Sequence, residues 1–149
     1  TKRPGQNFDT VPLKEDRVLA VLPPSRKNDA VKAFPLAAFK DERFIVSASY
    51  YDNDCYSVVE EFQRLYGEMP NKKVSATDPY TVISMVENGL GISVLPELIL
   101  KRGTENVIAL PIDPPFSRTI IMAVPCMETC SPATKKFIGY VKDFCKKET

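Results

Sequence analysis

The 149-residue sequence contains no histidine and only four cysteines. Without an imidazole, the chain has no histidine for general acid–base catalysis, for a nucleophile–histidine pair or for metal binding. Cys126 and Cys130 form a single C-x₃-C spacing, which is a weak zinc signal without further ligands. We interpret these two thiols, together with Cys55 and Cys145, as reduced cytosolic cysteines, with a redox or disulfide role as the alternative.

Paired carboxylates suited to catalysis are also lacking. The neighbours Glu60 and Glu61 lie in the middle of an expected helix, where adjacent side chains diverge. We therefore expect no catalytic residues, no metal and no cofactor, and we interpret the protein as something other than an enzyme.

Long apolar runs and an excess of one charge are absent as well. No stretch reaches the roughly 18 apolar residues that a membrane helix needs. Twenty Lys and Arg against 19 Asp and Glu give a formal charge of +1, so no nucleic-acid footprint is visible. The one basic cluster, "KKFIGYVKDFCKKE", has a helical apolar spacing, and we interpret its lysines as a solvated helix face, with a phosphate or partner surface as the alternative. No targeting pattern is found, and we expect a cytoplasmic protein.

Apolar periodicity predicts alternating strands and helices. Strands are expected at residues 16–24, 42–49, 72–77, 91–96, 106–110 and 117–125, and helices at 54–66, 79–88, 97–102 and 131–147. In the first helix an apolar stripe is expected to face a sheet; it consists of Val58, Val59, Phe62, Leu65 and Tyr66. Arg17 and Arg118, at strand starts, are expected on the surface or in ion pairs. The alternation is typical of an α/β domain with a largely parallel sheet and right-handed connections.

The stretch "MVENGLGISVLPELILK", residues 85–101, joins an expected helix to an expected strand through two glycines. Gly89 is placed to end the helix in the left-handed conformation, and Gly91 permits a turn or a close approach to another segment. The pattern is not a dinucleotide fingerprint, because that motif precedes a helix and not a strand. Both glycines are therefore expected to be structural.

The order of elements around this junction resembles a known family. The segment "VSATDPYTVISMVENGLGISVLPELIL" is similar to the effector-binding domain of LysR-type transcriptional regulators. The resemblance extends to "VPLKEDRVLAVLPPS", to "LAAFKDERFIVSA", and to "SRTIIMAV" with "SPATKKFIGYV", and so spans nearly the whole chain. One departure is "PSRKNDAV", where the family often has a histidine-proline-leucine turn.

The resemblance implies a periplasmic-binding-protein type II-like, Rossmann-type lobe with flanking helices. Residues 16–124 would form the second lobe, and residues 1–15 and 125–149 would be hinge or first-lobe elements. The implied function is binding of a small-molecule effector, with DNA bound only by a winged helix-turn-helix that this sequence does not contain. A full-length homodimer or homotetramer and no membrane partner are also implied. The alternatives are a solute-binding lobe on the same fold and a thiol-based redox sensor, for which Cys55 would be the candidate.

Two polar segments, each following an expected strand, are the candidate ligand contacts. If the two strands are parallel, both segments open on the same sheet edge, where α/β proteins bind ligands. The candidate ligand-binding residues are Ser47, Ser49, Tyr50, Thr77, Asp78, Tyr80 and Thr81. The serines are equally typical of strand-end hydroxyls bound to backbone, and the tyrosines of packing residues. Asp78 followed by Pro79 is expected to cap the next helix whatever else it does.

Overall fold

A computed structural model describes residues 8–27, 32–47, 54–68, 72–101 and 106–147. The chain divides into two compact units, which are Asp16–Arg118 and the combination of residues 1–15 with 119–149. Two long strands, β1 (Asp9–Leu22) and β6 (Ile108–Val124), run through both units. Within the described residues, no helix is both long and apolar enough to cross a membrane.

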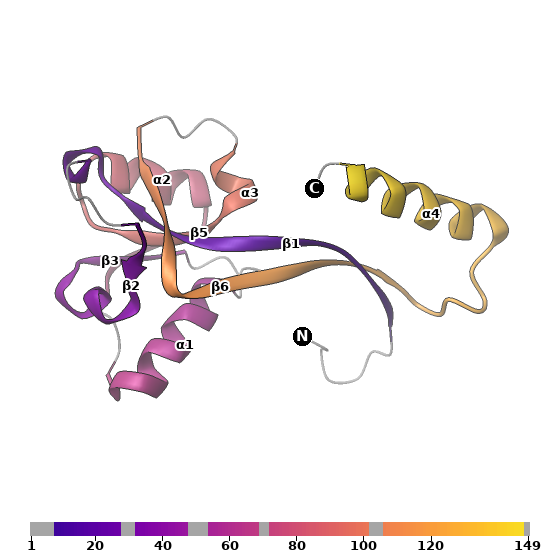
Figure 1. Ribbon diagram of the computed structural model, residues 1–149, viewed down its shortest axis with the longest axis horizontal. Helices are drawn as coiled ribbons and strands as arrows, with labels where there is room; N and C mark the ends of the chain where they lie inside the picture. The colour runs from indigo at the N-terminus through magenta and orange to yellow at the C-terminus, as the bar shows by residue number, and fades with distance from the viewer. Residues whose placement is uncertain (1–7, 28–31, 48–53, 69–71, 102–105, 148–149) are drawn as a thin grey trace. The chain divides into compact units, whose positions relative to one another are not determined.

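The strands of Asp16–Arg118 form a mixed arrangement (Figure 1). One sheet has the order β2-β6-β1-β5, in which β2 (Phe34–Pro35) is parallel to β6 and β5 (Ser93–Pro96) is antiparallel to β1. A second sheet pairs β3 (Phe44–Ser47) with β4 (Lys72–Ala76) in parallel. A parallel bridge between Phe44 and Ile92 connects β3 to the start of β5. The predicted α/β class is confirmed. The expected largely parallel sheet is mixed in the described part of the chain, because β1 and β5 pair antiparallel whereas β2 with β6 and β3 with β4 pair in parallel.

Both faces of the strands are covered, which explains why β1 is apolar without alternation. Val18, Ala20 and Leu22 join one buried cluster, whereas Leu19 and Val21 join another. The first cluster is closed by the 3₁₀ helix η2 (Leu36–Asp41) and by α1 (Asp54–Tyr66). The second is closed by α2 (Pro79–Glu87) and α3 (Glu97–Leu100). Figure 1 shows α2 and α3 on one side of the β1–β5 pair and α1 on the other.

The predicted Gly89–Gly91 junction is confirmed in both parts. Gly89 has φ +72°, and its N–H bonds to the Val86 carbonyl while Leu90 N–H bonds to Met85, which is the Schellman pattern of a helix end. At Gly91, a side-chain Cβ would lie well under 3.0 Å from the Arg43 carbonyl oxygen. The same segment pairs with β3 on both sides of that contact, through Ile92 N to Arg43 O and Ile45 N to Ile92 O. Gly91 therefore allows two backbones to approach each other.

Two sequence predictions were wrong in detail. Residues 106–110 and 117–125 were expected as separate strands, but both lie in the continuous β6. Pro114 and Pro115 do not end this strand, because the φ of proline suits extended backbone. In α1, Val58, Val59 and Phe62 are buried as expected, whereas Leu65 and Tyr66 are 46% and 42% exposed. The apolar stripe reaches beyond the part of the helix that the strands cover.

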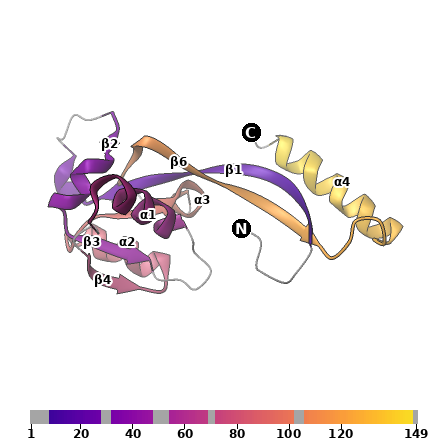
Figure 2. The same cartoon turned by 90° about the horizontal axis from the view of Figure 1, so that it is seen from below.

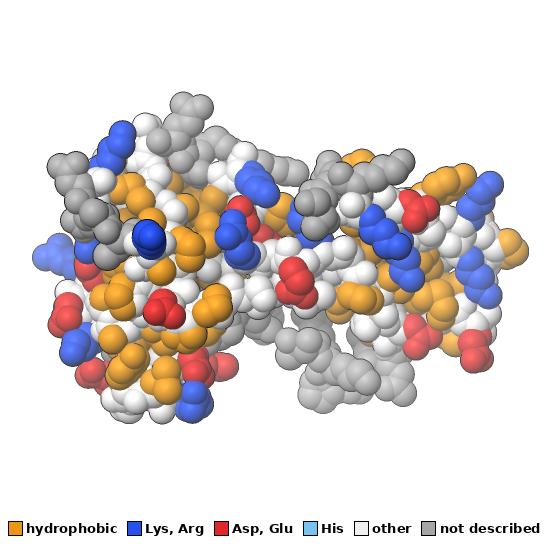
Figure 3. Space-filling view, viewed as in Figure 1, with side chains coloured by type: hydrophobic (Ala, Val, Ile, Leu, Met, Phe, Trp, Pro, Cys, Tyr) orange, Lys and Arg blue, Asp and Glu red, His pale blue; other side chains and the backbone are white. Residues whose placement is uncertain are grey.

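The unit made of residues 1–15 and 119–149 contains the first part of β1, the end of β6 and α4 (Pro132–Lys147). Ser131 caps α4 by accepting a 3.1 Å hydrogen bond from Thr134 N, at the start of the helix expected over residues 131–147. Val11, Val124 and Ile138 form a small buried cluster. The exposed face of α4 carries three aromatic side chains between its lysines, and Figure 3 shows apolar and basic side chains mixed over this helix. They are Phe137, Tyr140 and Phe144.

Candidate functional site

The parallel pairing of β3 with β4 puts the carboxyl ends of both strands, which the two predicted ligand segments follow in the sequence, at one edge. Ser47 lies opposite Ala76 in the register, so the chain leaves both strands at the same end, and Figure 2 also shows the strands side by side. Thr77 and Asp78 follow β4 immediately. Ser49 and Tyr50 follow β3 and lie outside the residues that the structure describes. The edge is thus a carboxyl end of parallel strands, the place where α/β proteins hold ligands.

Asp78 is the N-cap of α2, as predicted from the sequence. Its carboxylate accepts hydrogen bonds from Thr81 N at 2.7 Å and from the Thr81 hydroxyl at 2.9 Å. Both donors of Thr81 are therefore already bound, and only the hydroxyl oxygen of Thr81 can still accept a bond from a ligand. The negative charge of Asp78 at the helix start disfavours a second anion next to it.

The other candidates at this edge differ in how they can meet a ligand. Thr77 is exposed, and Tyr80 is 49% exposed. Ser47 is completely buried, which agrees with the alternative interpretation as a strand-end hydroxyl inside the protein. Ser93, which sequence reasoning missed, lies nearby in the core and donates a 2.7 Å hydrogen bond to the Ile45 carbonyl. Among the described residues of the edge, Thr77 and Tyr80 are exposed, whereas the exposed Asp78 and Thr81 are already hydrogen-bonded to each other.

We expect Asp78→Ala to lower the free energy of unfolding by about 1 kcal/mol, because the first turn of α2 loses the acceptor for Thr81 N. Asp78→Ser is the matched control, since a serine hydroxyl restores a capping acceptor and keeps most of the stability. Urea unfolding followed by far-ultraviolet circular dichroism measures both variants. Equal stability of the alanine variant and the wild type would show that this cap does not stabilise the domain.

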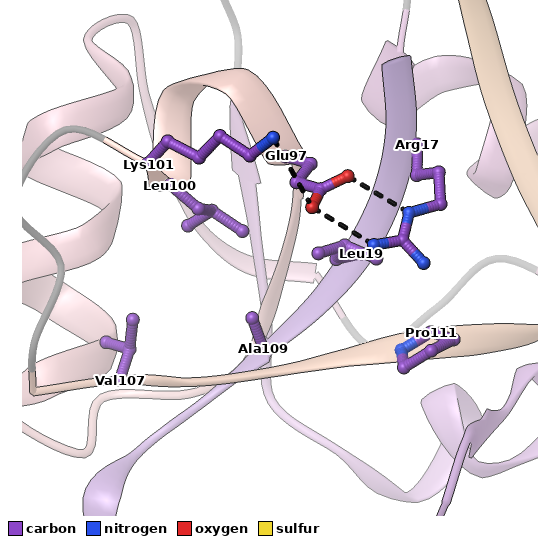
Figure 4. Close-up of a pocket in the computed structure, with 8 residues that line it drawn as sticks. All are labelled: Arg17, Leu19, Glu97, Leu100, Lys101, Val107, Ala109 and Pro111. Carbon is purple, nitrogen blue, oxygen red and sulfur yellow. Dashed lines mark hydrogen bonds and ion pairs between the residues drawn. The ribbon is translucent and has the colours of Figure 1, made fainter. Parts of the chain in front are cut away.

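A groove of about 320 Å³ lies elsewhere in the unit Asp16–Arg118, between β1, α3 and β6 (Figure 4). Arg17 binds Glu97 through two 3.0 Å hydrogen bonds, and Lys101 lies 3.8 Å from the same carboxylate. The hydrogen bonds to Glu97 and its charge raise the pKa of Arg17 above its ordinary value. The Glu97 carboxylate is thus shared by Arg17 and Lys101. The other lining residues of the groove are apolar, and they are Leu19, Leu100, Val107, Ala109 and Pro111.

A partly buried ion pair connects the two long strands, and the sequence indicates its arginine but not its carboxylate. The sequence predicts surface or ion-pair roles for Arg17 and Arg118, and the structure confirms an ion pair for each. The partner of Arg118 is Asp16, which is 2% exposed and also accepts a 3.1 Å hydrogen bond from Leu98 N. Nothing in the local sequence marks Asp16 as buried, because its partners lie 82 and 102 residues away. Among the described residues, no group of three His, Cys, Asp or Glu side chains could hold a metal ion.

The fold and the sequence together match one family. Residues 2–146 match the model described as the LysR substrate binding domain. The chain belongs to this family. Its α/β fold is that of LysR substrate-binding domains, which are similar to periplasmic-binding proteins of type II, and the expected class of protein is confirmed.

Curated relatives of this LysR-type chain are transcriptional regulators. It is 26% identical over 142 residues to the uncharacterized HTH-type regulator YvbU of Bacillus subtilis (strain 168), covering 94% of this chain and 47% of the relative. It is also 26% identical over 117 residues to the malonate utilization transcriptional regulator of Klebsiella pneumoniae, covering 78% of this chain and 37% of the relative. The chain thus spans half or less of the length of these relatives.

Solved effector-binding domains share the fold. The regulatory domain of CcmR from Synechocystis PCC6803, solved in complex with 2-PG, superposes with a TM-score of 0.84 at 19% identity. That match covers 98% of this chain and 71% of the CcmR chain. At this level of identity the likeness establishes the fold, while the ligand belongs to CcmR. The family favours the regulator interpretation over a solute-binding lobe or a thiol sensor.

Proposed function

We propose that this chain is the effector-binding part of a LysR-type transcriptional regulator and that it binds a small polar metabolite at the β3–β4 edge. The observation that carries the proposal is the match of residues 2–146 to the LysR substrate binding domain. The place of the site is supported by the parallel pairing of β3 with β4, which puts the carboxyl ends of both strands at one edge. The contact residues would be Thr77 and Tyr80, with Ser49 and Tyr50 joining them from the segment after β3.

The chemistry of the edge narrows the effector. Hydroxyl groups on Thr77 and Tyr80 both donate and accept hydrogen bonds, and such groups orient ligands in partly apolar pockets. The Asp78 carboxylate caps α2 next to them and repels an anionic group placed against it. We therefore expect an effector that presents hydroxyl or amine groups to this end of the site, with any acidic group directed away from Asp78.

Regulation follows from differential binding. An effector that prefers one of two arrangements of the regulator shifts the population toward it, and the shift reaches DNA only if that arrangement alters the DNA-binding part. In this proposal the DNA-binding part lies in the longer protein, outside this chain. The chain itself performs no catalysis. The whole regulator acts in the cytoplasm as a homodimer or homotetramer.

The proposal is tested by a thermal-shift screen of the full-length protein against amino acids, aromatic acids, organic acids and sugars. A ligand present at 100 times its dissociation constant adds about 2.7 kcal/mol to the free energy of unfolding. We expect one chemical class to raise the melting temperature of the wild type and Thr77→Ala to remove that rise. The matched control is Thr10→Ala, because Thr10 is also an exposed threonine but lies in β1 in the other unit.

The Thr77→Ala result tests the place of the site, and the screen as a whole tests the effector-binding function. Binding that survives Thr77→Ala would place the effector away from the β3–β4 edge while keeping the regulator function. If no compound class changes the melting temperature and none changes the DNA affinity of the full-length protein, the result argues against an effector-binding role.

A further inference from the structure

A five-residue turn between β6 and α4 holds two of the four cysteines. Cys126 and Cys130 are both partly exposed, and neither forms a disulfide. The turn is closed by a 3.4 Å hydrogen bond from Cys130 N to the Met127 carbonyl. The Cys130 thiol donates to the Cys126 carbonyl oxygen at 3.2 Å, so the second sulfur lies against the residue that carries the first. The two thiols therefore share one turn.

Contacts from outside fix this turn in place. The Asp9 carboxylate at the start of β1 accepts a 2.6 Å hydrogen bond from Met127 N, and Lys135 on α4 donates a 3.2 Å hydrogen bond to the Glu128 carbonyl. Thr129 donates its hydroxyl to the Cys126 carbonyl at 3.3 Å. The turn is therefore anchored at its middle and by the following helix, and the Cys130 sulfur lies against the Cys126 carbonyl within it.

The surroundings of Cys126 favour a thiolate. Hydrogen bonds from the backbone and side chain of Thr129 and from the backbone of Glu128 lower the pKa of the Cys126 thiol, against smaller opposing effects of burial and of the Asp9 charge. A ring of turn donors is a known way to hold an anion, and the thiolate is the form of cysteine that reacts. By contrast, Cys130 packs against the small apolar cluster around Val11.

We propose that the turn of residues 126–130 is a peroxide-reactive dithiol site, in which Cys126 reacts first and Cys130 resolves the product. This site is independent of the proposed effector edge. It also differs from the thiol alternative suggested by the sequence, which centred on Cys55, whose side chain lies outside the described residues. Two observations support the site, namely the shared turn and the unequal environments of its two sulfurs.

The chemistry balances with a peroxide as oxidant. The Cys126 thiolate attacks one peroxide oxygen, so that a sulfur–oxygen bond forms, the oxygen–oxygen bond breaks, and the leaving oxygen takes a proton from water. The product is a Cys126 sulfenic acid. The Cys130 sulfur then attacks the Cys126 sulfur, a disulfide forms, and the hydroxide that leaves takes the proton of the Cys130 thiol and becomes water. The two thiols together lose two electrons, and these reduce one peroxide molecule.

The test compares cysteine variants after treatment of the reduced protein with hydrogen peroxide. Cys126 and Cys130 lie in one tryptic peptide, residues 119–135, and Cys145 lies in another. In the wild type we expect the 119–135 peptide to lose two hydrogen atoms and to resist alkylation until it is reduced. In Cys130→Ser we expect a sulfenic acid on Cys126 that dimedone traps, and in Cys126→Ser we expect neither product.

Cys145→Ser is the matched control, because Cys145 is also a partly exposed cysteine outside any disulfide but lies near the end of α4. It should react like the wild type in the 119–135 peptide. Iodoacetamide should modify Cys126 several times faster than Cys145 at neutral pH. Equal alkylation rates of Cys126 and Cys145, or oxidation of Cys130 in Cys126→Ser at the rate at which the wild type loses its thiols, would overturn the assignment of Cys126 as the reactive thiol. Sulfenic acid that persists in the wild type would overturn the role of Cys130.

Discussion

Asp16→Ala is expected to lower the free energy of unfolding by about 2–3 kcal/mol, because a backbone N–H and a partly buried guanidinium both lose a buried acceptor. The Asp16 side chain is 1% exposed, accepts a hydrogen bond from Arg118 Nε at 3.0 Å, and forms an ion pair with Arg118 Nη2 at 2.9 Å. Its other oxygen accepts from Leu98 N at the start of α3. The substitution therefore leaves the Arg118 guanidinium without this carboxylate and a backbone donor without this acceptor.

A surface ion pair provides the control for Asp16. Arg17→Ala breaks the pair with Glu97, in which the Arg17 side chain is 62% exposed, and we expect a loss below about 1 kcal/mol. Asp16→Asn tests the charge separately, since an amide retains an acceptor of the same size. Urea unfolding and hydrogen exchange of the β1 amides measure these losses. If Asp16→Ala and Arg17→Ala lose the same stability, burial does not strengthen the Asp16 contacts.

Gly91→Ala is the second large effect, and we expect it to lower the free energy of unfolding by about 3 kcal/mol. A Cβ at this position would lie well under 3.0 Å from the Arg43 carbonyl oxygen and 3.2 Å from a side-chain carbon of Ile45. The Arg43 carbonyl oxygen belongs to the backbone and already accepts a hydrogen bond from Ile92 N. It therefore cannot move away from the new methyl group without breaking the connection between β3 and β5. Forcing a methyl group into a packed site of this kind distorts the backbone.

Two other glycines separate the crowding from the backbone conformation. Gly89→Ala has open space around its Cβ but a φ of +72°, so it should cost about 1–2 kcal/mol from the left-handed conformation alone. Gly139→Ala, within α4 and also in open space, should raise stability by up to about 1 kcal/mol, because alanine is the better helix former. Urea midpoints of the three variants give the comparison. A loss at Gly91 no larger than that at Gly89 would contradict the close approach.

The two substitutions also test how the domain is assembled. Asp16 connects β1 to β6 and α3, and Gly91 allows β5 to meet β3. Both contacts lie in the unit that carries the β3–β4 edge. A weakened Gly91 contact would disturb the parallel strands behind Thr77, so effector binding in the proposed site should be measured only where this variant still unfolds cooperatively.

Local chemistry in the sequence determined the kinds of elements and many of their ends. Asp78 marked a helix start, Gly89 marked a helix end, and the apolar run of residues 16–24 marked a strand. These signals act within a few residues, so the sequence alone carries them. The family resemblance rested on the order of the same elements.

Only the tertiary structure decided what meets across long separations. It placed Asp16 against Arg118, Gly91 against Arg43, and the ends of β3 and β4 at one edge. It also joined two expected strands into the single strand β6, buried the Ser47 side chain, and left the Leu65 side chain exposed. These outcomes depend on which surfaces cover one another, because burial and the pairing of distant charges arise from packing and not from local conformational preference.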